Sequence, residues 1–356
     1  MDISYLLFLQ SIREATGFAA DAFFNAVSSL GSTYPAIIII ALVYWSVDKR
    51  TGIYLMFTDL WSSLVGQTMK IIFCVPRPWI RDPRISPVEG AVPEATGYSF
   101  PSGHSTNAVS VFGGLFVRIR ALLRGKTASE ETVSGQDVSA KERSGAKAPS
   151  GPVSVILRVI MIVSLILAIL ICFSRNYCEV HTLSDVLVGA GIGVIFLIVS
   201  GPLMRIYYEK KNADLIISGI TILLAVLSMV FASLKAYPEL LSASGGLLVD
   251  PAEMRMDTYR FAAIIIGAFA GFVIENRFAR FGTHSVKISR RVLRTVIGLI
   301  IAVIILLPVS SALYAVIGED AGRIAKYIIL AVVLVGIYPC CFAAVERKLD
   351  KKQTGI

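Results

Sequence analysis

The chain is dominated by apolar stretches of about 20 residues, and these stretches leave few folds open to it. A helix of that length crosses the roughly 30 Å apolar core of a bilayer. Hydrophobic residues make up 55% of the 356-residue sequence and charged residues only 17%, and the mean hydropathy is +0.71. Soluble domains carry about 25% charged residues. The sequence therefore excludes a soluble enzyme and a disordered chain, and it predicts an all-α, polytopic membrane helical bundle.

We predict about nine transmembrane helices after an amphipathic N-terminal segment. In residues 1–30, apolar side chains are interrupted by Arg13, Glu14 and Asp21, which favours a helix in the membrane interface over a poor first span. Residues 31–208 are expected to form a core and residues 209–356 to add four helices. The Ser-, Gly-, Ala- and Lys-rich stretch 125–150 predicts a flexible loop within the core. The predicted spans are 32–47, 51–73, 102–122, 153–174, 183–207, 213–235, 258–279, 291–317 and 323–345.

The net charge of +9 is unevenly divided among the predicted loops. One set of alternate loops holds 23 Lys and Arg against 10 Asp and Glu, a net +13, and the rest of the chain nets −4. Cytoplasmic loops carry the basic excess in membrane proteins. We therefore predict an N-terminus outside, with the 125–150 loop and the C-terminus cytoplasmic. This orientation explains the positive charge without a nucleic acid partner. The basic loops are 48–50, 118–158, 205–214, 275–294 and 346–352.

Three clusters of polar residues fall at one predicted membrane face, the outer one. Because the orientation comes from the charges alone, this agreement is independent of any motif. Five scattered cysteines offer neither a disulfide framework nor the spacing of a zinc site. The clusters are Lys70 with Arg77-Pro78, then Pro101-Ser102-Gly103-His104, then Ser174-Arg175 with His181 and Asp185.

The cations of these clusters suit a phosphate group. The guanidinium fork of Arg77 or Arg175 matches phosphate oxygens, and the Lys70 ammonium supplies a point charge. Ser102 and Gly103 fall at a predicted helix start, where unpaired backbone N–H groups and the helix dipole favour an anion. The outer face is therefore a candidate phosphate site.

The two histidines of the clusters suit two catalytic roles. One imidazole can attack phosphorus, and the other can protonate the leaving oxygen. Asp185 follows His181 by four residues, so a helix beginning there puts both on one face, where the carboxylate can hold one ring nitrogen and leave the other for attack. The third histidine, His284, falls in a basic loop on the opposite side and is expected to be a surface residue.

These spacings resemble the type 2 phosphatidic acid phosphatase superfamily, which includes the vanadium haloperoxidases. The pattern K-x6-RP, PSGH and SR-x5-H-x3-D stands here in that order. The resemblance implies a helical-bundle phosphatase that needs no metal or other cofactor and works through a phosphohistidine. By motif position, His181 is the nucleophile, Asp185 its partner and His104 the general acid and later base. The phosphoryl oxygens would be bound by Lys70, Arg77, Ser102, Gly103 and Arg175.

One position departs from the family pattern. The family usually has glycine two residues before the histidine of the third motif, and this chain has Glu179. A carboxylate beside a phosphate site repels substrate unless it has a cationic partner. Arg81 and Arg84, in the preceding outer loop, are the candidate partners.

Several functions are compatible with a phosphate site at the outer membrane face. Lipid phosphates such as phosphatidic acid, phosphatidylglycerol phosphate or polyprenyl phosphates and diphosphates are the expected substrates, because the site lies at head-group depth. The layout is also similar to the membrane glucose-6-phosphatases, which favours a soluble phosphomonoester. Phosphotransfer to an acceptor hydroxyl is a third alternative and transport a fourth. The expected partners are the lipid bilayer and, as a weaker candidate, a second copy of the chain. The expected location is a bacterial plasma membrane, or an endoplasmic reticulum with a luminal site.

Overall fold

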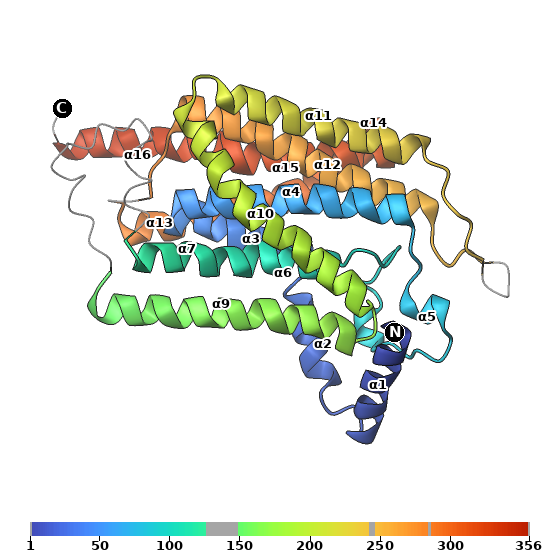
Figure 1. The fold of residues 1–356 in the computed structure, drawn as a ribbon. Helices are drawn as coiled ribbons and strands as arrows, with labels where there is room; N and C mark the ends of the chain where they lie inside the picture. The colour runs from blue at the N-terminus through green and yellow to red at the C-terminus, as the bar shows by residue number, and fades with distance from the viewer. Residues whose placement is uncertain (1, 126–148, 242–245, 284–285, 355–356) are drawn as a thin grey trace. The chain divides into compact units, whose positions relative to one another are not determined.

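The computed structural model describes residues 2–125, 149–241, 246–283 and 286–354, and these residues form helices joined by loops (Figure 1). They contain no sheet, and their one isolated β-bridge joins Leu241 and Leu247. Several of the long helices contain a π-helical turn, such as Val109–Gly113 between α6 and α7. The helices are α1 (Asp2–Ala15), α2 (Asp21–Ser29), α3 (Thr33–Leu42), α4 (Lys49–Phe73), α5 (Pro78–Arg81), α6 (Gly103–Ala108), α7 (Gly114–Leu123), α9 (Gly151–Tyr177), α10 (Leu183–Glu209), α11 (Ala213–Leu234), α12 (Pro251–Ile274), α13 (Ile288–Ile304), α14 (Ser310–Ile317), α15 (Glu319–Val332) and α16 (Tyr338–Thr354).

Seven helical stretches of the described chain are long and apolar enough to cross a bilayer. An eighth is obtained when α2 and the α3 stretch, which meet at a bend of 53°, are counted as one broken span. At the place of the second predicted span, α4 has 25 residues but is less apolar than the seven. The prediction of an all-α, polytopic membrane bundle is confirmed. The seven stretches are Gly103–Leu123, Gly151–Tyr177, Leu183–Glu209, Ala213–Leu234, Pro251–Ala279, Ile288–Ile317 and Glu319–Asp350.

The N-terminal segment forms two helices, where the sequence suggested one. The chain turns between α1 and α2 because Gly17 and Phe18 both adopt the left-handed backbone conformation, at φ 60° and 61°. A single α-helix cannot pass through two such residues. The turn folds α2 back, and Arg13 near the end of α1 then pairs with Asp21 at the start of α2, with 2.9 Å between Nη2 and Oδ2.

The chain divides into two compact units that are not contiguous in sequence. The first unit comprises residues 1–40, 54–209 and 236–254. It contains all three polar clusters and the segment that joins α11 to α12. The second unit comprises residues 41–53, 210–235 and 255–356.

In the first unit, α6, α7, α9 and α10 pack together around small residues. Gly189 and Gly193 of α10 face the start of the α6–α7 stretch, and a Cβ at Gly193 would lie 2.8 Å from the Val109 side chain. Such close approach of helices is what a Gly-x3-Gly spacing permits. On the other side, α9 packs against α2, α6 and α7 through an apolar cluster that includes Ala108, Phe112 and Ile171.

The second unit is held by buried polar pairs among its apolar helices. Lys49 binds Glu275 with 2.6 Å between Nζ and Oε1. Arg294 donates from Nε and Nη2 to the two carboxylate oxygens of Glu346. The Trp45 ring packs where Gly298 leaves room for it. These pairs satisfy charges that would otherwise be costly to bury. The predicted loop 125–150 falls almost wholly outside the described residues, and so does His284.

Candidate active site

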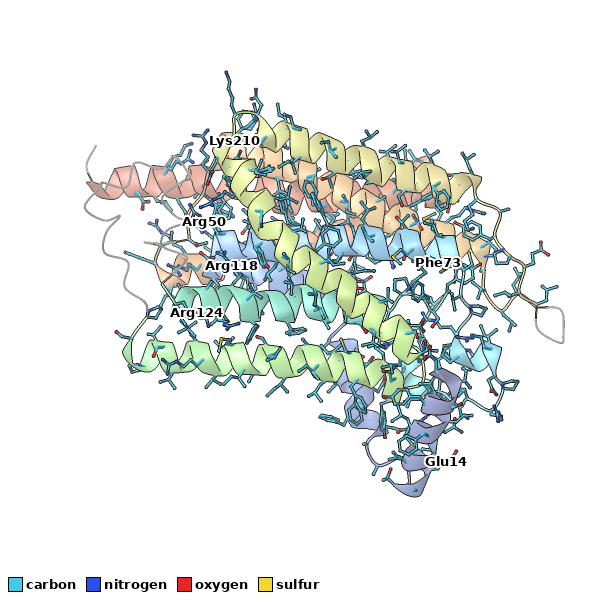
Figure 2. The ribbon with its side chains drawn as sticks, in the orientation of Figure 1. Glu14, Arg50, Phe73, Arg118, Arg124 and Lys210 are labelled. Carbon is cyan, nitrogen blue, oxygen red and sulfur yellow. The ribbon has the colours of Figure 1, made fainter. Side chains whose placement is uncertain are left out.

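The three polar clusters meet at one end of the first unit. The first spans the end of α4 and the loop after it, the second lies at the N-terminus of α6, and the third runs from the end of α9 through a short turn to the start of α10. Hydrogen bonds join them: Arg77 Nη1 lies 2.8 Å from His181 Nε2, for example, and Ser102 N donates to Asp185 O at 3.0 Å. Figure 2 labels Phe73 at this end of α4 and Arg124 at the opposite end of α7. The site therefore lies at the end of the spans, far from the basic α7 terminus.

His181 and Asp185 form a pair because the start of α10 is capped by its own sequence. Thr182 Oγ1 accepts from Asp185 N, and Asp185 Oδ2 accepts from Thr182 N at 2.8 Å, as in a capping box. The cap holds the Asp185 carboxylate beside the turn, with Oδ2 3.6 Å from His181 Nδ1. Both residues are buried. The carboxylate thus faces one nitrogen of the ring and leaves the other, Nε2, on the opposite side.

Ser99 completes this pair and was missed by sequence reasoning. Its Oγ donates a short hydrogen bond to Asp185 Oδ2 and lies 3.4 Å from His181 Nδ1. Ser99 is fully buried, and its N–H is bound to Val75 O at 2.7 Å. A serine in a loop without periodicity carries no signal in a single sequence, so its role could not be predicted.

Arg77 is aimed at His181 by three backbone carbonyl groups. Its guanidinium donates to Thr96 O, Gly97 O and Val180 O at 2.8, 3.1 and 2.9 Å. Arg77 Nη1 also contacts the His181 ring, with Nε2 at 2.8 Å and Nδ1 farther away at 3.5 Å. Because a guanidinium only donates, Nε2 must accept, and the ring proton is then on Nδ1, facing Asp185.

The electrostatics of this contact keep the His181 ring neutral. Burial, followed by the charges of Arg77 and Arg175, lowers the pKa of His181 well below its usual 6.5. The pKa of Arg77 is lowered to about 9 by burial and by Arg175, so its guanidinium still carries a charge at neutral pH. The site therefore presents an imidazole lone pair among cations.

Arg175 ends α9 with unused hydrogen-bonding capacity. Nη1 donates to Ser28 Oγ, whereas Nε and Nη2 have no hydrogen-bond partner among the described residues, although Arg175 is fully buried. A buried donor without a partner costs free energy. Lys70, in the last turn of α4, is half-buried, and its charge also contributes to the lowered pKa of His181. Both cations are therefore close to the ring, and Arg175 has two donors left for an anion.

The PSGH cluster begins the α6–α7 helix. Ser102 is its N-cap, and Ser102 Oγ accepts from Ser105 N at 3.4 Å and from Ser105 Oγ at 2.9 Å. A Cβ at Gly103 would meet no heavy atom within 4 Å, so the backbone there borders open space. Open space beside unpaired N–H groups at a helix start can admit an anion.

His104 pairs with Glu94, which sequence reasoning also missed. The Glu94 carboxylate accepts from His104 Nε2, with 3.1 Å between Nε2 and Oε2. The carboxylate is about two-fifths exposed and the ring is mostly buried. Glu94 therefore covers the ring nitrogen from the open side.

Glu179 is paired, but the expected partners were wrong. Its Oε1 lies 2.6 Å from Arg13 Nη1, and Arg84 is bound instead to Asp82 within its own exposed loop. The proposed pairing relied on nearness in the loop, whereas α1 lies against the buried turn. Sequence separation gave no signal for this contact, which joins residues 166 positions apart.

Two family models match the chain, and between them they cover more than half of it. The PAP2 superfamily model matches residues 51–208, which contain all three clusters. A second model, described as PAP2 superfamily phosphatase, transmembrane extension, matches residues 259–352. The chain belongs to the PAP2 superfamily. It is a multi-pass membrane phosphatase of that superfamily, with its transmembrane extension in α12–α16. No curated protein and no solved structure matches it.

The described part of this PAP2 superfamily chain offers no cluster of three His, Cys, Asp or Glu side chains that would hold a metal ion. All five cysteines are free thiols. The site brings together two histidines, their carboxylate partners and three cations.

Proposed function

We propose that the protein hydrolyses lipid phosphate monoesters at the extracytoplasmic membrane face through a phosphohistidine on His181. The observation that carries the proposal is the two-sided environment of that ring. Asp185 faces Nδ1, and the Arg77 guanidinium, a phosphate-binding group, lies 2.8 Å from Nε2. A phosphoryl group bound by Arg77 is then next to the lone pair that attacks it.

The reaction proceeds in two steps. In the first, His181 Nε2 attacks phosphorus, an N–P bond forms, and the bond to the leaving oxygen breaks as His104 gives that oxygen a proton. In the second, His104 takes a proton from water, the oxygen of which attacks phosphorus and releases phosphate and His181. Asp185 stabilises the ring while it carries positive charge. Lys70, Arg77, Arg175, the Ser102 hydroxyl and the Gly103 N–H would hold the phosphoryl oxygens.

Exposed apolar side chains close to the site favour a lipid substrate. Phe73, three residues after Lys70, is 56% exposed, and Leu187, two residues after Asp185, is 61% exposed. Side chains of this kind on spanning helices belong in the acyl region of a bilayer. The phosphate group of a membrane lipid therefore lies at the depth of the site.

The test is a phosphate-release panel with the purified, full-length protein in nanodiscs. We expect release from phosphatidic acid or a polyprenyl phosphate, little from glucose 6-phosphate, persistence in EDTA, and inhibition by vanadate. His181→Ala should abolish release while the protein elutes and melts as the wild type does. Preference for the sugar phosphate would overturn the lipid assignment, and near-normal turnover in His181→Ala would overturn the nucleophile.

A further inference from the structure

The turn that presents His181 contains a residue in an unfavourable backbone conformation. Glu179 adopts φ 58°, in the left-handed region, and is fully buried. Glycine occupies that region without steric cost, whereas a residue with a Cβ does not. The conformation explains why glycine suits this position. It also means that a glutamate here needs a compensating interaction.

Arg13 supplies that interaction from α1. Arg13 is 3% exposed, and its Nη1 binds Glu179 Oε1 at 2.6 Å and Ser86 O at 3.0 Å. Its Nε and Nη2 hold both oxygens of Asp21. Nearly every donor of Arg13 is therefore used to join α1, α2, the loop after α4 and the turn before His181.

The same turn holds Arg77 in place. Val180, which follows Glu179, accepts from Arg77 Nη1 through its carbonyl group at 2.9 Å, and this nitrogen also reaches His181 Nε2. A shift of the Glu179 backbone would move the Val180 carbonyl and with it the direction of the Arg77 guanidinium. The contact path runs from Arg13 through Glu179 and Val180 to Arg77.

The α1–α2 hairpin is packed to transmit such a restraint. Ala20 and Phe24 lie against the buried cluster that contains Tyr177, Cys178 and Val180. Tyr177 Oη donates to Asp21 Oδ1 at 3.0 Å, so the carboxylate that holds Arg13 also holds the end of α9. The hairpin and the turn are thus one packed assembly.

We propose that Arg13 is a positioning residue for the phosphate site, acting through its buried ion pair with Glu179. Loss of Arg13 leaves a buried carboxylate without its cation, in a backbone conformation that disfavours a side chain. The turn then relaxes, and Arg77 loses its alignment with His181. The proposal rests on the proposed function in one respect, namely that Arg77 binds the phosphoryl group.

The experiment compares Arg13→Met, Glu179→Gly and the double variant with the wild type, all as full-length protein in nanodiscs. Arg84→Met is the matched control, because it breaks an exposed ion pair in the neighbouring loop. The readouts are kcat, KM, the inhibition constant for vanadate, and the unfolding temperature. Vanadate inhibition reports how well the site binds a phosphate-like anion, which a purely structural contact would leave unchanged in the folded fraction.

We expect Arg13→Met to lower kcat and weaken vanadate binding by about tenfold or more, since a misplacement of about 1 Å can cost about a hundredfold in rate. Glu179→Gly added to Arg13→Met should restore most of both values, because glycine accepts the turn and removes the unpaired carboxylate. Arg84→Met should leave both unchanged.

Two results would overturn the proposal. One is an Arg13→Met protein that is less stable but has wild-type kcat and vanadate affinity. The other is a double variant no better than Arg13→Met. Failure of the proposed function is distinguishable, because it appears as an active His181→Ala protein. Recovery of the double variant is measured as phosphate release. It therefore tests the role of Arg13 whether or not His181 is the nucleophile.

Discussion

Asp185 uses one side chain both to cap a helix and to face the proposed nucleophile. Its side chain caps α10 through Thr182, and the same oxygen faces His181 Nδ1. The H-x3-D spacing was readable in the sequence because it coincides with a helix start, where a carboxylate three residues after the N-cap has a local partner. Ser99 and Glu94 were not readable, since each meets its histidine only through the folded loop after α4.

The buried, neutral state of His181 predicts a specific dependence of stability on pH. The folded-state pKa of His181 lies well below 6.5 because of burial and the neighbouring cations, whereas the unfolded-state pKa is about 6.5. Below that pH the unfolded chain binds a proton that the folded chain does not. The contribution of His181 to stability is therefore complete above about pH 6.5 and is lost progressively as the pH falls.

We expect the unfolding temperature of the wild type to fall more steeply below pH 6.5 than that of His181→Asn, which has no such proton to bind. Differential scanning fluorimetry in detergent from pH 4.5 to 8 would measure the two slopes. Equal slopes below pH 6.5 would mean that His181 is protonated in the folded protein, contrary to this account.

At the scale of elements, the loop after α4 depends on the segment between α11 and α12. Tyr98 is fully buried in a cluster with Val249 and Met254, and Gly97 adopts φ 62° against the Met254 side chain. Gly97 O also accepts from Arg77 Nε. Val249 and Met254 thus pack against the loop whose carbonyl groups orient Arg77. These contacts explain why the segment belongs to the first unit.

We predict that Gly97→Ala lowers both activity and stability. A Cβ at this position overlaps the end of Met254, and φ 62° disfavours alanine, so a loss of about 1–3 kcal/mol in unfolding free energy is expected. Met254→Ala added to Gly97→Ala removes the overlap but not the backbone strain, and should restore part of both quantities. If neither activity nor stability recovers in the double variant, the steric overlap with Met254 is not a cause of the loss.

The contacts of the N-terminal hairpin show where sequence reasoning reached its limit. Its amphipathic pattern was readable, but the two left-handed residues at 17 and 18 that divide it were not. The partner of Glu179 was misassigned because a single sequence gives no distance between residues in different segments. Phe8, Ile12, Phe18 and Phe23 are exposed on the hairpin, and its place in the membrane interface stays a prediction.

At the scale of the whole molecule, the bilayer orientation is the prediction that decides where the reaction occurs. In the first unit the site and the basic α7 terminus lie at opposite ends, as Figure 2 shows for Phe73 and Arg124. Basic residues near span ends favour the cytoplasm. The site is then expected to face the outside.

Cysteine labelling of intact cells would test this orientation. In a variant with the five native cysteines replaced by serine, Ser86→Cys should react with an impermeant maleimide, and Arg124→Cys should react only after the cells are opened. Retained phosphate release would serve as the control for folding. The reverse pattern of labelling would invert the topology and place the site in the cytoplasm.

The general architecture could be predicted from the sequence because membrane-spanning helices are recognisable by their length and apolar composition. The grouping of the chain into two units could not be predicted from the sequence. Residues 236–254 follow α11 in the chain but belong to the first unit, and the contacts that place them there leave no periodic pattern in the sequence. The three clusters were found because their residues are charged or catalytic in type. Their precise alignment through the Thr96, Gly97 and Val180 carbonyl groups required the fold.

The proposed reaction passes through a phosphorylated His181, and trapping this phosphoenzyme would detect the intermediate itself. In His104→Ala protein, water is no longer activated and the leaving oxygen no longer receives a proton. Phosphoenzyme formed from ³²P-labelled p-nitrophenyl phosphate, whose leaving group departs without a proton, should therefore accumulate. We expect label that is stable in base, labile in acid, mapped to the peptide containing His181 and absent from a His104→Ala/His181→Ala double variant. Label on another residue, or equal label in the double variant, would contradict it.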